Sequence, residues 1–183
     1  MRDKKVTSEL FKNILIELGE DCKRTGLLET PRRMAEVADY LTSGYHEDID
    51  SLVNNALFPT SNKDIVIVKN IEFYSLCEHH LLPFWGTCTI GYVPDTNVIG
   101  LSKIPKIVDM YSRRLQIQEQ LTCDIANALQ YAANASGVIV HIEAQHLCMM
   151  MRGVEKQNAT TITRHVAGSI DQSSENIFSC SLR

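Results

Sequence analysis

The sequence predicts an α+β fold in which two N-terminal helices precede a unit of two strands, two helices and two strands. Apolar residues recur at helical spacing in some segments, whereas β-branched and aromatic residues dominate others. Strands that follow one another in pairs favour antiparallel hairpins, with the middle helices packed on one face of the sheet. This arrangement is favoured over a doubly wound parallel sheet.

Composition and charge limit the class of protein. The 183 residues, 44% of them hydrophobic, suffice for one domain or for a compact domain with an N-terminal appendage. We expect an N-terminal helical region at 1–62 and a second domain at 63–183. The formal net charge of −4 gives no general attraction to nucleic acid or to an anionic membrane. No apolar run approaches the ~20 residues of a membrane-spanning helix.

The cysteines indicate a reducing compartment. They are scattered along the chain, and its first residues do not have the pattern of a secretion signal. Free thiols and metal ligands are therefore favoured over disulfides, and a cytoplasmic protein fits best. Core positions or exposed thiols are expected for Cys22, Cys88, Cys123 and Cys180.

Two helices are predicted in the N-terminal region. The first covers residues 7–19, with Thr7 as its cap. The second begins in the stretch TPRRMAEVADYLTSG, where Thr30 can cap the helix, the next proline fits its first turn, and Gly44 can stop it. Residues 46–63 are polar and are interpreted mostly as a connector.

The remaining elements follow from the same two periodicities. β-Branched and aromatic stretches predict strands, apolar residues at helical spacing predict helices, and the polar residues after 170 are expected to be loose. The predicted strands are 64–76, 84–93, 137–150 and 160–170, and the predicted helices are 102–111 and 118–135.

A metal site is predicted in the stretch CEHHLLPF, which starts at Cys77. Zinc prefers thiolate and imidazole ligands, and the Cys-x-x-His spacing of Cys77 and His80 allows both ends of a tight turn to bind one ion. A turn is favoured over a continuous strand because Pro83 and the double histidine interrupt the pattern. In a turn, His79 points away from the metal but stays beside it.

The third ligand is expected in the stretch QHLCMMMRG at 145–153. His146 and Cys148 are two residues apart in a predicted strand and therefore share a face, so that one can bind metal while the other stands nearby. Cys77, His80 and Cys148 would leave one coordination position open, which is the pattern of a catalytic zinc. Water in that position would have its pKa lowered towards ~7.

A structural zinc with four protein ligands remains an alternative, with His79 or His146 as the fourth ligand. Ordinary polar positions are expected for His141 and His165. The three consecutive methionines at 149–151 are expected to pack in a core or an interface rather than to bind metal.

Five stretches together resemble the GTP cyclohydrolase I family. They are LLETPRRMAE (27–36), CEHHLLPF (77–84), GLSK (100–103), YSRRLQIQEQLT (111–122) and QHLCMMMRG (145–153). The resemblance implies the tunnelling fold, in which a four-stranded antiparallel sheet with two helices assembles with its copies into a barrel. It also implies a homodecamer with active sites at subunit interfaces. The implied reaction opens the imidazole ring of GTP, releases formate and forms 7,8-dihydroneopterin triphosphate, the first step towards folate or tetrahydrobiopterin.

The resemblance assigns roles to matching positions. Cys77, His80 and Cys148 match the zinc ligands, in agreement with the spacing. His79 and His146 match two proton-transferring histidines, and a neutral-range pKa suits imidazole to that task. His146 is the better candidate for protonating N7 of the purine, and His79 for the later ribose steps. The remaining position, Ser102, matches a serine near the ribose.

The resemblance also implies the substrate contacts. Glu119 can accept hydrogen bonds from the N1–H and 2-amino groups of guanine, and Gln118 resembles its family neighbour in the same role. Cations are needed for the triphosphate, and the matching residues are Lys103, Arg152, Lys106 and Arg33, the last donated by a neighbouring subunit. Lys106 stands where the family often has arginine and therefore lacks the bidentate fork.

Two other functions remain open at this point. One is a different enzyme of the tunnelling-fold superfamily that acts on another purine or pterin. The other is a non-catalytic purine-binding or scaffold oligomer with a structural zinc. A metal site without an open position would favour the second.

Overall fold

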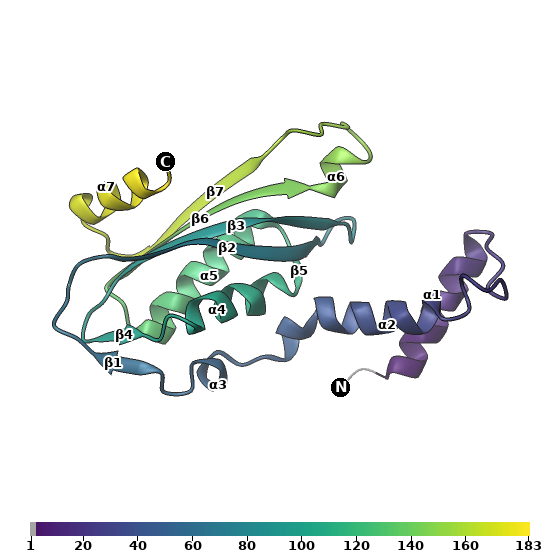
Figure 1. Cartoon of the computed structure of the whole chain (residues 1–183), viewed down its shortest axis with the longest axis horizontal. Helices are drawn as coiled ribbons and strands as arrows, with labels where there is room; N and C mark the ends of the chain where they lie inside the picture. Colours follow the sequence, from purple (N-terminus) through teal and green to yellow (C-terminus); the bar gives the residue numbers. More distant parts are fainter. Residues whose placement is uncertain (1–2) are drawn as a thin grey trace. The chain divides into compact units, whose positions relative to one another are not determined.

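The computed structural model describes residues 3–183 and has the predicted α+β class (Figure 1). The chain forms two compact units, of which one ends at Ser43 and the other runs from Gly44 to Arg183. Strand β1 (Leu57–Pro59) pairs with β4 (Asn97–Ile99), so residues shortly before position 62 belong to the second unit.

The first unit contains α1 (Lys4–Glu17) and α2 (Thr30–Leu41). The prediction that Thr7 caps α1 was wrong, because Asp3 is the cap and its carboxylate accepts from the backbone N–H groups of Lys5 and Val6. Asp and Thr are both good caps, so residue type alone could not choose between them.

The second helix begins one residue earlier than expected. Thr30 is already helical, the cap position is Glu29, and no side chain caps the helix there. Pro31 lies in the first turn, as predicted. The helix ends at Leu41, and the predicted stop, Gly44, lies in the short 3-10 helix η1 (Ser43–His46), where a Cβ would clash with the carbonyl of Met110.

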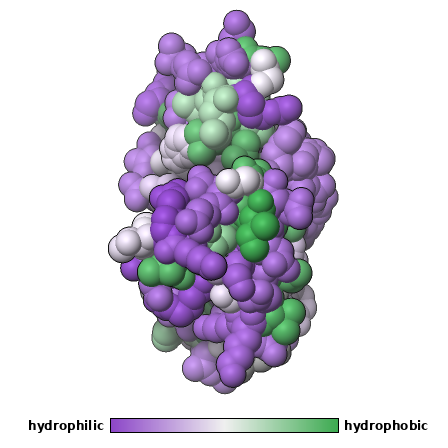
Figure 2. All heavy atoms as spheres, turned by 90° about the vertical axis from the view of Figure 1, so that its right-hand side faces the viewer, coloured by the Kyte–Doolittle hydropathy of each residue, from purple (hydrophilic) through white to green (hydrophobic). Residues whose placement is uncertain are grey.

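Apolar side chains remain exposed on both helices of the first unit. Exposed fractions of the side chains are 59% for Leu10, 52% for Ile14, 45% for Val37 and 59% for Tyr40. The face in Figure 2 likewise shows hydrophobic groups interspersed among hydrophilic ones. Such groups are available for contact with a partner.

The stretch expected to be mostly connector has structure of its own. It contains α3 (Ile49–Val53) and β1, and Asp48 caps α3 by accepting from the Ser51 N–H at 2.9 Å. Both elements are shorter than a reliable periodic pattern, which is why the polar composition dominated the prediction.

The main sheet contains the four predicted strands and one more. Its order is β5-β2-β3-β6-β7, and the pairs β2–β3, β3–β6 and β6–β7 are antiparallel. The addition is β5 (Leu115–Gln116), which pairs parallel with the end of β2. The sheet is therefore mixed rather than purely antiparallel. The other strands are β2 (Val66–Cys77), β3 (Pro83–Val93), β6 (Gly137–His146) and β7 (Thr161–Gly168).

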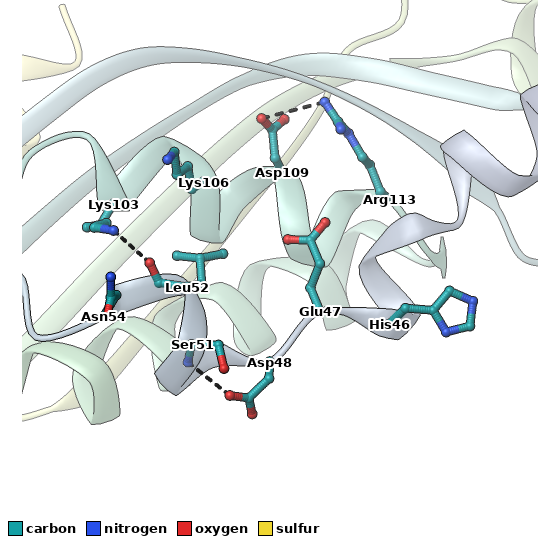
Figure 3. A pocket seen from close by; sticks show the side chains of 10 residues that line it. All are labelled: His46, Glu47, Asp48, Ser51, Leu52, Asn54, Lys103, Lys106, Asp109 and Arg113. Atoms are coloured by element: carbon teal, nitrogen blue, oxygen red, sulfur yellow. Dashed lines mark hydrogen bonds and ion pairs between the residues drawn. The ribbon is translucent and has the colours of Figure 1, made fainter. Parts of the chain in front are cut away.

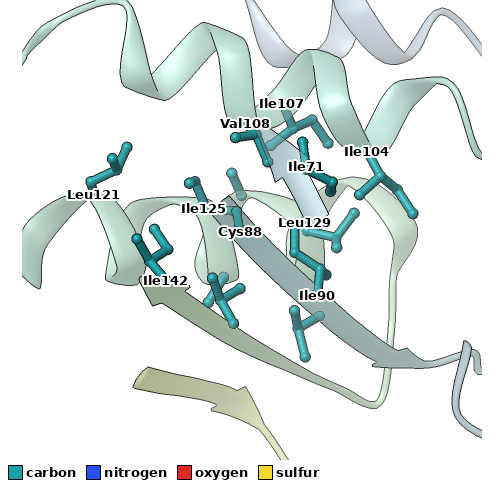
Figure 4. Packing of buried hydrophobic residues seen from close by; sticks show 14 of the residues in the cluster. Ile71, Cys88, Ile90, Ile104, Ile107, Val108, Leu121, Ile125, Leu129 and Ile142 are labelled. Carbon is teal, nitrogen blue, oxygen red and sulfur yellow. The ribbon is translucent and has the colours of Figure 1, made fainter. Parts of the chain in front are cut away.

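Helices α4 (Lys103–Ser112) and α5 (Gln118–Ala133) cover one face of this sheet (Figure 1). Alternate strand residues turn towards them and form the core. Ile107 from α4, Ile125 from α5 and Ile142 from β6 are each 0% exposed (Figure 4). Burial of such side chains contributes about 1.5–3 kcal/mol each.

The expectation of a loose tail was wrong. Residues Gln172–Ser181 form α7, which is capped by Asp171 through a bond from Ser174 N–H at 2.9 Å. Phe178 is 0% exposed and lies against Gly91, where a Cβ would meet its ring at 2.7 Å. Gly91 alternates with the residues that face α4 and α5, so α7 covers part of the opposite face.

No helix in residues 3–183 is long and apolar enough to cross a membrane.

Candidate metal centre

The ends of four strands and the start of α5 meet at one end of the main sheet. Phe84, near the start of β3, pairs with His146, the last residue of β6. Cys77, the last residue of β2, pairs with Gln116 of β5, and α5 begins two residues later. The backbone register therefore brings segments that are distant in the sequence to the same place.

The Cys-x-x-His stretch forms the predicted turn. The Leu81 N–H donates to the Cys77 carbonyl at 2.8 Å, and the Cys77 N–H donates to the Leu82 carbonyl at 2.9 Å. Leu81 has a φ of +55°, a conformation that is strained for a leucine. The turn thus reverses the chain between β2 and β3 while keeping Cys77 and His80 close together.

Cys148 lies beside them, but not for the predicted reason. The expected strand at 137–150 ends at His146, and Cys148 belongs to the short helix α6 (Leu147–Met150). The shared-face argument for His146 and Cys148 was therefore wrong. Even so, the ligand atoms of Cys77, His80 and Cys148 all lie within 4.8 Å of one another. The Sγ of Cys77 is 3.8 Å from Nδ1 of His80.

This set of donors fits a divalent metal ion. Two sulfurs and one imidazole nitrogen are the ligand types that zinc prefers. Burial raises the pKa of the Cys148 thiol, and the neighbouring Cys77 acts in the same direction. A cation between the sulfurs would offset both effects by stabilising the thiolates.

Neither histidine proposed as a fourth ligand belongs to the cluster within the described part of the chain. His79 has a side chain that is 65% exposed, and its Nε2 lies 3.7 Å from the Glu78 carboxylate. His80 is also on the exposed side of the turn. This geometry favours a centre with three protein ligands and access to solvent over a closed structural site.

His146 is held beside the cluster by two neighbours. Its ring stacks on that of Phe84, with centroids 4.7 Å apart and planes 2° apart. Its Nε2 lies 2.8 Å from Oε1 of Gln118. Burial lowers the pKa of His146, and the charge of Glu119 opposes that effect. Sequence reasoning gave no role to Phe84, although it ends the CEHHLLPF stretch.

The expected guanine contacts, Gln118 and Glu119, have different surroundings. Gln118 is 1% exposed, and both polar atoms of its carboxamide have hydrogen-bond partners in the protein. Glu119 is exposed in the first turn of α5. Thr163 and Thr122 complete the buried network around Gln118, and no sequence signal pointed to either of them.

The expected phosphate contacts are divided among separate places. Arg152 is at the metal cluster, where its Nη1 donates to Nε2 of His80 at 3.1 Å. Lys103 and Lys106 line a cavity of about 630 Å³ between α3 and α4 (Figure 3). Neither the three clustered ligands nor His146 lines this cavity. Arg33 is exposed on α2, in the unit that ends at Ser43.

The cavity has mixed charge. Asp109, Glu47 and Asp48 line it together with the two lysines and Arg113. Lys103 donates from Nζ to the carbonyl of Leu52 at 2.8 Å, and Arg113 lies 3.7 Å from Asp109. Ser102 is exposed and precedes α4, where its side chain makes no cap bond.

Comparison with known structures first defines the class. An archaeosine synthase QueF-Like protein, solved in its apo form, superposes with a TM-score of 0.50 at 19% identity over 61% of this chain and 100% of that one. This likeness concerns the fold alone: the chain has the tunnelling fold, and a Cys/His group that could hold a metal ion lies at one end of its sheet.

The sequence comparisons then identify the family. The family model for GTP cyclohydrolase I matches residues 7–182, and the chain belongs to that family. A GTP cyclohydrolase 1 of Methylococcus capsulatus is 57% identical over 163 residues, which are 89% of this chain and 88% of that protein. A GTP cyclohydrolase 1 of Pseudomonas syringae pv. tomato is 55% identical over 90% of this chain and 88% of that protein.

Proposed function

We propose that this protein opens the imidazole ring of GTP, releases C8 as formate and forms 7,8-dihydroneopterin triphosphate, a precursor of folate and of tetrahydrobiopterin. One observation carries the proposal. Cys77, His80 and Cys148 converge within 4.8 Å in a chain whose residues 7–182 match the GTP cyclohydrolase I family. His146 stands next to this cluster, where a hydrolytic ring opening needs a proton donor.

Zinc is the proposed metal, held by Cys77, His80 and Cys148. When bound, it supplies a Lewis acid and lowers the pKa of water so that a nucleophile is available at neutral pH. The chain itself supplies the proton transfers. His146 protonates N7 of the purine as this atom becomes a leaving group, and the exposed His79 acts in the later ribose steps with Ser102.

Guanine recognition is assigned to Glu119. A carboxylate accepts hydrogen bonds and can face the N1–H and the 2-amino group of guanine together. Support comes from its exposure at the start of α5, one residue from the buried Gln118 that bonds to His146. Adenine lacks both donors, so ATP is a matched control substrate of the same charge.

The triphosphate is assigned to Arg152, Lys103, Lys106 and Arg33. Arg152 now donates to Nε2 of His80. If Nδ1 of His80 is coordinated, Nε2 carries the ring proton and cannot accept that bond. The guanidinium of Arg152 is then available to an anionic group.

The active site is proposed to be complete only in a homodecamer. Within the second unit, Arg152 lies at the Cys/His cluster, whereas Lys103 and Lys106 line the cavity beside α4, so the expected phosphate-binding cations are already divided between two places. Exposed apolar side chains on α1 and α2 and the outer edge of β7, which pairs with no further strand within residues 3–183, offer surfaces for assembly. The elution volume and light scattering of the purified protein test this part.

The decisive experiment incubates the zinc-loaded protein with GTP and measures formate and, after oxidation, pterin fluorescence. Both products are expected from GTP and neither from ATP. His146→Ala should retain zinc while turnover falls by about 10²- to 10⁴-fold, the contribution typical of a positioned acid. Absence of formate from the wild-type protein would leave only another tunnelling-fold activity or a non-catalytic role. Full activity of His146→Ala would refute the assigned acid.

A further inference from the structure

The side chain of Gln118 is almost completely enclosed, yet it has four polar partners. Its Nε2 lies 3.2 Å from the carbonyl of Ile142, 3.0 Å from that of Thr161 and 3.1 Å from Oγ1 of Thr163. Its Oε1 lies 2.8 Å from Nε2 of His146. The side chain is 1% exposed, so water does not replace these partners.

These partners determine which way the carboxamide faces. Backbone carbonyls can only accept, so the two carbonyls of Ile142 and Thr161 require the NH₂ group on their side. The oxygen is consequently left to face His146. A flipped amide would bring its oxygen against two carbonyl oxygens inside a buried site, which is strongly unfavourable.

The orientation of the amide in turn determines the tautomer of the histidine. The amide oxygen can only accept, so Nε2 of His146 must carry the hydrogen in the bond between them. In the neutral ring Nδ1 is then the nitrogen with the free lone pair. Stacking on Phe84, with planes 2° apart, fixes the plane of the ring.

We propose that Gln118 is a positioning residue that holds His146 as its Nε2–H tautomer, so that the proton exchanged with the substrate is carried on Nδ1. The inference rests on the proposed function, in which His146 is the acid. It differs from the role that the resemblance implies for Gln118, a direct contact with guanine. All polar atoms of this carboxamide already have partners in the protein, whereas the exposed Glu119 is free to face the base.

The kinetic test uses Gln118→Met, which keeps the length of the side chain and removes its acceptor. We expect kcat to fall by about 10- to 100-fold, part of what a positioned acid contributes. KM for GTP and zinc content should stay unchanged. In the His146→Ala background the same substitution should cause no further loss, because nothing is left to position.

Thr122→Val is the matched control. It removes a buried hydroxyl that bonds to Thr163 and to the backbone carbonyl of Gln118, but it leaves the carboxamide and His146 in place. Its kcat should equal that of the wild type. A similar loss in Thr122→Val and Gln118→Met would mean that disturbance of the buried network, not the tautomer, explains the effect.

A direct measurement of the tautomer uses the wild-type protein and does not require Gln118→Met to fold. Solid-state NMR of the ¹⁵N-histidine-labelled wild-type protein at alkaline pH reports which ring nitrogen is protonated, and the His146 signal is assigned by its loss in His146→Ala. A protonated Nε2 supports the proposal, and a protonated Nδ1 overturns it. A rise of KM in Gln118→Met without a fall of kcat would instead assign Gln118 to guanine. None of these results contradicts the proposed function. The proposed function fails only if the wild-type protein releases no formate from GTP.

Discussion

The Cys/His cluster and the cavity beside α4 are positioned differently. Cys77 of the cluster ends β2 and the nearby His146 ends β6, so the backbone register of the sheet places both, whereas the cavity is lined by side chains on helix surfaces and loops. Cys77 is buried and His146 is half-buried, but Lys106 is exposed. Groups that take part in bond making or breaking must be positioned accurately, whereas a triphosphate can be bound by long cationic side chains that adjust to it. The difference suggests that changes at the cluster act on turnover and changes at the cavity act on affinity.

The largest expected effect comes from breaking the cluster with Cys148→Ser. The hydroxyl is a poor substitute for a thiolate ligand, so bound zinc and activity should be lost together, the latter by about 10³-fold or more. Elemental analysis and formate release measure the two quantities. The control is Cys180→Ser, at an exposed thiol on α7, which should keep both. Zinc retained at full occupancy in Cys148→Ser would show that this cysteine is not a ligand.

A smaller effect is expected at the cavity from Lys106→Ala. Loss of one charge-assisted bond to phosphate should raise KM for GTP about tenfold and leave kcat almost unchanged. Lys106→Arg keeps the charge and should bind GTP at least as well as the wild type. Steady-state kinetics at low ionic strength give the clearest reading, because salt screens exposed charges. A loss confined to kcat would contradict the division between the two regions.

The smallest expected effect is a change in stability from Leu81→Gly, in the turn that contains His80. Leu81 has a φ of +55° and is 61% exposed, so Leu81→Gly relieves backbone strain and gives up little burial. The left-handed conformation costs roughly 1–2 kcal/mol in a non-glycine residue, and glycine adds about 0.5–1 kcal/mol of chain entropy. The free energy of unfolding should therefore rise by up to about 1 kcal/mol. Leu81→Ala keeps a Cβ and should show no such gain in the same denaturant titration.

The elements that could be predicted are those with long periodic patterns. Strands β2, β3 and β7 and helices α4 and α5 lie close to their predicted ranges, because each has a sustained periodic pattern, which in β7 is an alternation of half-buried and exposed residues. The strand predicted at 137–150 failed at its end, since a short apolar run does not distinguish a strand from a helix, and α6 begins after His146. The two-residue β5 is too short to leave any pattern.

The site divides in the same way. Ligand types and the Cys-x-x-His spacing predicted Cys77 and His80, and the resemblance assigned Cys148 as the third ligand; the ligand atoms of all three converge. The contacts that hold His146 could not be read from the sequence, because Phe84 and Thr163 look like ordinary strand residues there. Pairing register, a property of the whole sheet, decides which of them meet.

The C-terminal helix has a practical consequence. Phe178 fills the space where a side chain on Gly91 would lie. Cγ2 of Ile139 is 3.0 Å from the position that a Cβ on Gly91 would occupy, so Phe178 and Ile139 lie near each other. Removal of the polar-looking C-terminal segment would therefore leave a cavity on this face of the sheet and expose apolar surface to solvent. Purification handles are better appended beyond Arg183 than exchanged for the last dozen or so residues.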